Sequence, residues 1–398
     1  MPVTGNRRNY GRPSSANART GQQGRARAPA INNNAAAAYL GSWANAKTYV
    51  KAAVAHVDDG EIARTLDHIS EQRENCDLFE GIRSAHKTIE ALAAGSTIEA
   101  TFPAINELES SPKKAQRMFA SLADAHNQRA LAAMAADSEW HTARLRSVLG
   151  WCASGWLQAI PCMQPLYMPP EEFRTACKLR LGMIHPQVSP IATCMCGARP
   201  DLLGTHYMAC KIGNQRSIRH DHVAATLKQM LLALGHVARV NGLQDLLPVG
   251  PAGEARVVDV YGAAGPLMAK AVAIDVAVVH PVCDSYVKAA AATSRATAAG
   301  REEIKMAKYG QACDDVGISF IPAVFESYGT AGEIFEGWFK KVMKAKDKMD
   351  KEMGSNKVSW TAHTSGAYWQ QRLSVALQRG NAKMVHRRGA RDSTEDTA

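Results

Sequence analysis

The feature that most constrains the fold is a pair of short apolar runs, each of which carries one aspartate. The first run spans residues 256–261 and contains Asp259, and the second spans residues 271–279 and contains Asp275. A turn with two glycines and one proline, at 262–266, separates them. Because apolar runs bounded by Gly and Pro are typical of buried strands, we predict that the two runs form a β-hairpin.

A carboxylate inside a buried strand is costly unless it is paired, and here two lie on neighbouring strands. A divalent cation would neutralise both, and Mg²⁺ binds a few carboxylates together with water and phosphate oxygens. The Ala-rich segment after the hairpin carries Lys305, Lys308 and Tyr309, which could fold back towards the acids. The pattern therefore indicates a metal-dependent site that cleaves phosphodiesters, although either aspartate alone could instead pair with an arginine or cap a turn.

The composition of the chain limits its class. Its 398 residues suffice for two or three domains, and its 46% hydrophobic content is ordinary for a globular protein. No apolar run is long enough to span a membrane and the N-terminus lacks the apolar core of a signal peptide, so we expect an intracellular protein without a membrane partner. Nine scattered cysteines are an odd number, which favours a reducing compartment over a disulfide scaffold. The net charge of +10 favours polyanionic partners.

The N-terminal part of the chain contains no pattern of catalytic or metal-ligating residues. Residues 1–34 contain six arginines and no acidic residue. Such a segment buries too little apolar surface to order itself, so we predict a disordered basic arm that neutralises phosphates, with a solvated tail or a targeting sequence as the alternative. Residues 35–150 are rich in alanine with helical spacing, and we predict a bundle of helices. Its histidines are expected on helix surfaces: His68, His86, His126 and His141.

A compact group of metal-ligating residue types follows a connector that begins at Trp151 and a helix that we expect to end at Gly182. The group consists of three cysteines and one histidine within 17 residues: Cys194, Cys196, His206 and Cys210. Three thiolates and an imidazole suit tetrahedral Zn²⁺, and His206 and Cys210 are spaced so that one helical turn could present both. The sequence therefore predicts a small CCHC zinc knuckle; the alternative is three unrelated buried thiols and a surface histidine.

Three basic residues follow this group: Arg216, Arg219 and His220. We predict that these residues lead into an amphipathic helix over 223–234, which Gly235 ends. Arg219 and His220 would lie at the helix start, and a helix N-terminus attracts anions. These residues are therefore candidates for binding nucleic-acid phosphates. The alternative is a solvated first turn in which Asp221 interacts favourably with the helix dipole.

The predicted order of elements across residues 219–325 is helix, strand, strand, strand, helix, strand, followed by a helix over 331–348 and another over 364–378. This α+β order, αβββαβ, is that of the restriction-endonuclease-like, or PD-(D/E)XK, fold. We therefore expect five regions: the basic arm at 1–34, the helical region at 35–150, the connector and zinc knuckle at 151–216, the restriction-like endonuclease domain at 217–350, and a C-terminal helix with a polar tail at 351–398.

The sequence resembles a known family at this point. The resemblance rests on the following residues: Trp156-Leu157, Phe173, Arg180-Leu181-Gly182, Cys194, Cys196-Gly197, His206, Cys210, Arg219-His220, Asp259, Asp275-Val276, Pro281, Lys308-Tyr309, Pro322 and Gly329. They are similar to the C-terminal region of non-LTR (LINE-type) retrotransposon polyproteins, where a zinc knuckle precedes a restriction-like endonuclease. The resemblance covers residues 150–340, and the chain lacks the reverse transcriptase of that family.

The resemblance implies a nuclear DNA endonuclease, with RNA as an alternative ligand. Asp259 and Asp275 would bind Mg²⁺, and because Ala277 stands where the general nuclease pattern has lysine, Lys305 or Lys308 would take that role, with Tyr309 beside it. Val258 replaces the proline usual before the first acid, which motivates an alternative: a decayed, zinc-containing nucleic-acid-binding protein. A third hypothesis is a protein–protein interaction module built on the N-terminal helices.

Overall fold

The computed structural model describes residues 84–91, 115–185, 188, 193–212, 214–243, 247–250, 253–354 and 361–395. The chain forms two compact units, residues 1–134 and 135–398. In the first unit, a helix at 84–91 and helix α4 (Ala115–Ala135) are described. The predicted basic arm at 1–34 lies outside the described residues, as does most of the predicted helical region, including His68.

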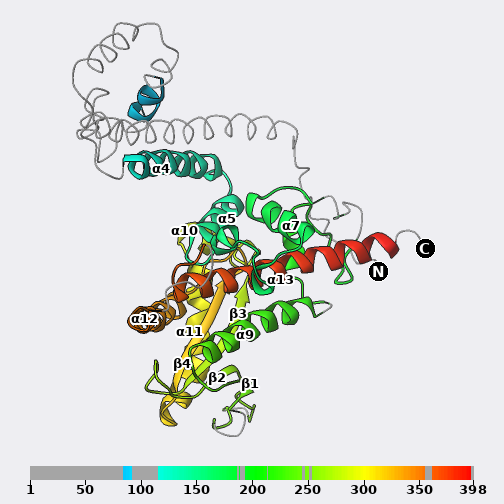
Figure 1. The fold of residues 1–398 in the computed structure, drawn as a ribbon. Coiled ribbons are helices and arrows are strands. Elements are labelled where there is room, and N and C mark those ends of the chain that lie inside the picture. The colour runs from blue at the N-terminus through cyan, green and yellow to red at the C-terminus, as the bar shows by residue number, and fades with distance from the viewer. Residues whose placement is uncertain are drawn as a thin grey trace, which may run out of the picture. The chain divides into compact units, whose positions relative to one another are not determined.

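The second unit is a mixed α/β structure that contains every candidate site residue (Figure 1). Its helices before the sheet are α5 (Glu139–Leu149), α6 (Gly155–Gln158), η4 (Gln164–Leu166), α7 (Pro170–Leu181), α8 (Thr205–Ala209) and α9 (Gln215–Ala233). Its remaining elements are β1 (Ala238–Gly242), β2 (Val258–Gly262), β3 (Val272–Val279), α10 (Val287–Ala292), α11 (Ala296–Asp315), β4 (Ser319–Glu326), α12 (Glu333–Glu352) and α13 (Ser365–Glu395).

The four strands form one mixed sheet in the order β1-β2-β3-β4. The predicted hairpin is confirmed, because β2 and β3 pair antiparallel with Val260 opposite Ile274. β4 pairs parallel with β3, and a parallel pair needs a long crossover, which α10 and α11 supply. The α+β class and the order of elements across 219–325 are therefore as expected, except that two helices, α10 and α11, lie between β3 and β4 where one was predicted. Strand ends differ from the predicted ones by up to three residues.

Helices cover both faces of the sheet. Successive side chains of a strand point to opposite faces, so Ile274 and Ala273 define the two sides of β3. Ile274 belongs to a core that includes residues of α9, α12 and α13, among them Leu227 and Phe335. Ala273 packs in a second core with Tyr309 of α11. The sheet is thus a middle layer between α9, α12 and α13 on one side and α11 on the other.

The C-terminal helix is longer and more deeply packed than expected. We predicted a helix over 364–378 followed by a polar tail, but α13 runs from Ser365 to Glu395. Trp369, Leu373 and Leu377 recur at four-residue spacing and are buried in the main core. α13 lies alongside α9 (Figure 1), so it is part of the sheet-containing unit.

Local sequence signals explain several element ends. Gly182 adopts a left-handed conformation with φ +65° and ends α7, as its position predicted. The tryptophans of the connector also pack as expected: Trp151 contacts Phe339 with ring centroids 4.9 Å apart, and Trp156 is buried. Among the described helices, none is long and apolar enough to cross a membrane.

Candidate metal cluster and carboxylate site

Three cysteines and one histidine come together as the sequence predicted. The ligand atoms of Cys194, Cys196, His206 and Cys210, which we call the Cys/His cluster, all lie within 4.8 Å of one another. The Sγ atoms of Cys194 and Cys210 are 3.8 Å apart, and Cys196 Sγ lies 3.4 Å from His206 Nε2. Cys194 and Cys210 are buried, whereas Cys196 is exposed. The cluster could therefore hold a metal ion.

Two of the distances between these atoms match the edges of a zinc tetrahedron. With Zn–S bonds of about 2.3 Å, two tetrahedral sulfur ligands lie about 3.8 Å apart, and a sulfur and a nitrogen lie slightly closer. The two measured distances, 3.8 and 3.4 Å, match these edges. The donor set of three thiols and one imidazole leaves no open position, which is typical of a structural site.

Two local features build the Cys/His cluster. Gly197, at φ +83°, lets the chain turn back after the first two cysteines, and its N–H donates to the carbonyl of Cys194 at 2.7 Å. The carboxylate of Asp201 accepts hydrogen bonds from the backbone N–H groups of Thr205 and His206, at 3.1 and 2.6 Å. Asp201 therefore satisfies the free donors at the start of α8 and fixes the helical turn that carries His206 and leads to Cys210.

The two aspartates of the hairpin come together in one cleft. The paired register of β2 and β3 reaches Val260 opposite Ile274, so Asp259 directly precedes this pair on β2 and Asp275 directly follows it on β3. The two carboxylates lie close enough to interact, because each affects the pKa of the other. Asp275 is buried at 5% exposure, and both aspartates line the same cleft. The meeting of two acids from neighbouring strands, on which the sequence reasoning depended, is thus observed.

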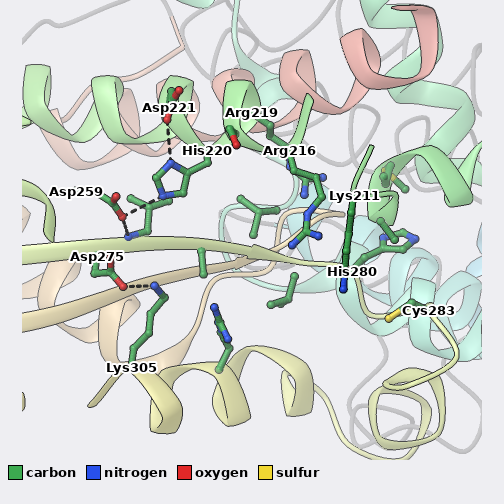
Figure 2. Close-up of a pocket in the computed structure, with 18 of the residues that line it drawn as sticks. Lys211, Arg216, Arg219, His220, Asp221, Asp259, Asp275, His280, Cys283 and Lys305 are labelled. Atoms are coloured by element: carbon green, nitrogen blue, oxygen red, sulfur yellow. Dashed lines mark hydrogen bonds and ion pairs between the residues drawn. The ribbon is translucent and has the colours of Figure 1, made fainter. Parts of the chain in front are cut away.

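Each carboxylate has a cationic or N–H partner. Lys305, buried on α11, donates to Asp275 Oδ2. His220 of α9 contacts Asp259 Oδ2 through Nε2 at 3.0 Å, and the backbone N–H of Val276 donates to the same oxygen at 2.6 Å. Because α9 and α11 cover opposite faces of the sheet, His220 and Lys305 approach the acids from opposite sides (Figure 2). We call these four side chains the carboxylate site.

The electrostatics of the carboxylate site are asymmetric. Burial raises the pKa of Asp275 to about 6, helped by the charge of Asp259 and opposed by Lys305. Burial also opposes ionisation of Asp259, but the hydrogen bond and charge of His220 outweigh it and lower the pKa of Asp259. For His220, burial alone would lower the pKa, whereas the carboxylates of Asp259 and Asp221 raise it to about 9. Asp259 and His220 therefore form a charged pair, and Asp275 is the carboxylate that is harder to ionise.

Of the two candidate lysines, Lys305 contacts an aspartate and Lys308 does not. Lys308 is exposed, and its Nζ lies 4.7 Å from the ring centroid of Tyr309. Tyr309 is buried and packs on Phe320 with ring centroids 5.3 Å apart, so it is part of the hydrophobic core between α11 and the sheet. Lys305 and Lys308 were both candidates on sequence because helical spacing alone does not show which turn of α11 faces the acids.

The basic residues near the start of α9 lie in different environments. The helix begins at Gln215 and not at Arg219, so the expected position of Arg219 and His220 at the helix N-terminus is wrong. Arg219 is buried at 2% exposure, and its Nη1 donates to Asn381 Oδ1 of α13 at 2.9 Å. Arg216 is exposed in the first turn. Sequence reasoning began the helix too late because it followed the apolar pattern, which starts at Val223.

A cleft of about 970 Å³ connects these features. It runs from residues that flank Cys210 to the carboxylate site, and its charged lining residues are Lys211, Arg216, Arg219, Asp221, Asp259, Asp275, Arg301 and Lys305. In Figure 2 the labelled aspartates lie at one end, and Lys211 and Arg216 lie towards the other. Sequence reasoning missed Lys211 and Arg301. Arg301 precedes Lys305 by four residues on α11, and this helical spacing was the signal that could have found it.

Comparison with known proteins does not identify the chain. No protein-family model matches it. A search of curated proteins likewise found no significant match.

Proposed function

We propose that the carboxylate site binds Mg²⁺ and cleaves phosphodiester bonds in DNA. The observation that carries this proposal is the meeting of Asp259 and Asp275, from adjoining strands, with Lys305 reaching Asp275 from the next long helix. Two oxygen donors of this kind suit a hard cation. The like charges of the two aspartates raise the cost of ionising Asp275, and a bound cation would offset that cost.

The side chains of the proposed nuclease have distinct roles. Asp259 and Asp275 would hold the ion, which would supply Lewis-acid stabilisation of the scissile phosphate and an activated water. Lys305 is the cation placed to stabilise negative charge that develops on the phosphate. The N–H of Val276 and the ring of His220 hold the Asp259 carboxylate in position from two directions. Lys308 and Tyr309 are assigned no part, because neither contacts an aspartate.

The Cys/His cluster supports the second part of the proposal, a structural zinc ion. Zinc would fix the segment between Cys194 and Cys210, and Met208 and Ala209 of this segment line the cleft. The order of a zinc knuckle, a helix and a βββαβ core is also that of the restriction-like endonuclease region of non-LTR retrotransposons. We therefore propose the PD-(D/E)XK fold for residues 217–350 and a retroelement origin for residues 150–340.

One observation favours a second candidate function. Both carboxylates are already neutralised within the chain, Asp259 by His220 and Asp275 by Lys305. A site that has lost its cation and kept internal pairs would look the same. The alternative is therefore a zinc-containing nucleic-acid-binding protein without cleavage activity.

A plasmid-nicking assay with Mg²⁺ separates the two candidates. The wild type should convert supercoiled plasmid to the open circle, and Asp275→Asn should abolish this conversion. Asp314→Asn, at an exposed aspartate near the end of α11, is the matched control and should cleave like the wild type. Absence of cleavage by the wild type, or equal cleavage by all three proteins, would favour the binding protein.

A further inference from the structure

The cations that line the cleft are divided into paired and unpaired groups. Five lysines and arginines line it against three aspartates, so the lining is positive overall. All three aspartates have partners: Asp221 and Asp259 contact His220, and Asp275 contacts Lys305. Arg219 is buried against Asn381. The side chains of the other three cations make no hydrogen bond, ion pair or ring contact with any residue that the structure describes: Lys211, Arg216 and Arg301.

These three unpaired cations come from two separate parts of the fold. Lys211 directly follows Cys210 of the Cys/His cluster, and Arg216 lies in the first turn of α9. Arg301 lies on α11, four residues before Lys305, so α11 places both cations along the same cleft. All three are exposed and can contact a polyanion without breaking an ion pair to any residue in the described part of the chain. In Figure 2, Lys211 and Arg216 lie towards one end of the cleft, and Asp259, Asp275 and Lys305 lie towards the other.

We propose that Lys211, Arg216 and Arg301 form a phosphate track that holds a single strand of nucleic acid as it runs from the Cys/His cluster to the carboxylate site. This inference rests on the proposed function for the identity of the ligand. A cleft of about 970 Å³ is at the upper end of the size of small-molecule sites. A cleft of this size takes a short stretch of one backbone, and binding of a duplex is the alternative that the experiment below separates.

In this proposal the paired and the unpaired side chains of the cleft have different roles. Lys305 and His220 act at the scissile phosphate, beside the aspartates that they contact. The track residues bind phosphates further along the same strand and set the register of the strand relative to Asp259 and Asp275. Such contacts position the backbone and carry no sequence information. A zinc ion would help to position the track, because it would fix Cys210, the residue directly before Lys211.

Salt-dependent binding tests the track independently of cleavage. The probe is a fluorescent oligothymidylate of about 12 nucleotides, bound in Ca²⁺ so that strand cleavage does not interfere, at several salt concentrations. Each of Lys211→Gln, Arg216→Gln and Arg301→Gln should reduce the slope of log K against log salt by about 0.7, and the triple variant by about 2. Lys270→Gln, at an exposed lysine outside the cleft, should keep the wild-type slope.

The outcomes distinguish this inference from the proposed nuclease. A triple variant that keeps the slope of Lys270→Gln while retaining wild-type zinc content and circular dichroism overturns the track. If the triple variant lowers the slope of log K against log salt for a duplex of the same length but not for the single strand, the single-strand assignment is overturned. If the slopes fall as expected and the wild type cleaves nothing, the track stands and the nuclease proposal fails.

Discussion

His220 on α9 and Asp259 on β2 lie 3.0 Å apart, Nε2 to Oδ2, although 38 residues separate them in the chain. The contact joins a helix on one face of the sheet to an acid of the central hairpin. Nδ1 of the same ring contacts Asp221 at 3.1 Å, so the imidazole is held between two carboxylates (Figure 2). This arrangement fixes the orientation of Asp259 before any ligand binds.

The His220–Asp259 pair should make stability depend on pH in a defined direction. The folded-state pKa of His220 is raised to about 9, above the value of about 6.5 expected in the unfolded chain. Its contribution is therefore complete below about pH 6.5 and is lost as the pH rises through about 9. We expect His220→Gln to lower the free energy of unfolding by about 1.5–3 kcal/mol more at pH 6 than at pH 10, measured by urea denaturation without added Mg²⁺. An equal loss at both pH values would contradict the charged pair.

Lys305 should be essential for keeping Asp275 ionised. Lys305→Met leaves a buried carboxylate without its cation, and breaking a buried pair in this way costs about 3–5 kcal/mol. We expect a loss of this size at neutral pH, measured by chemical denaturation, and proton uptake by Asp275 that infrared spectroscopy can detect. Because Asp275→Asn removes the orphaned charge, the double variant should recover most of the lost stability. A double variant as unstable as the sum of the two single variants would show that the residues are not coupled.

The sequence predicted the hairpin and the gathering of the Cys/His cluster because both depend on local signals. Gly and Pro bound the strands, and the four ligands fall within 17 residues. The partner of Asp259 could not be predicted in the same way, since the pairing of His220 with it depends on how α9 packs across the sheet. Arg219 illustrates the same limit: a charged residue beside a basic run suggested a solvent-facing role, but α13 covers it and Asn381 accepts its hydrogen bond. The partners and the burial of such residues depend on long-range packing, which cannot be read from a single sequence.

A structural zinc ion should be detectable and should depend on particular cysteines. We expect native mass spectrometry to find one zinc per chain, and Cys194→Ser or Cys210→Ser to lose it, because a thiolate is removed from a closed four-ligand set. Cys283→Ser, at a partly buried cysteine of the cleft lining, should retain it. Chelation should lower the melting temperature of the wild type and leave that of Cys194→Ser unchanged. Retention of zinc by both cluster variants would place the metal elsewhere.

His280 should make the protein sensitive to mild acid. Its ring is buried beside Ser327, and Nδ1 lies 2.7 Å from the Ser327 hydroxyl. Burial, reinforced by the charge of Arg219, lowers the pKa of His280 to about 3. The unfolded chain takes up a proton near pH 6.5 and the folded chain does not, so the histidine favours unfolding as the pH falls below that value. Between pH 7.5 and pH 5 this amounts to about 2 kcal/mol.

His280→Asn should reduce this acid sensitivity, because asparagine can keep a hydrogen bond to Ser327 and has no proton to gain. We expect its free energy of unfolding to fall by about 2 kcal/mol less than that of the wild type between pH 7.5 and pH 5. His363→Asn, at an exposed histidine, is the control and should follow the wild type. Because His280 also lines the cleft, the comparison should be made without nucleic acid or added Mg²⁺. Parallel pH curves for wild type and His280→Asn would mean that the folded protein accepts the proton, and that the His280 pocket opens to water in acid.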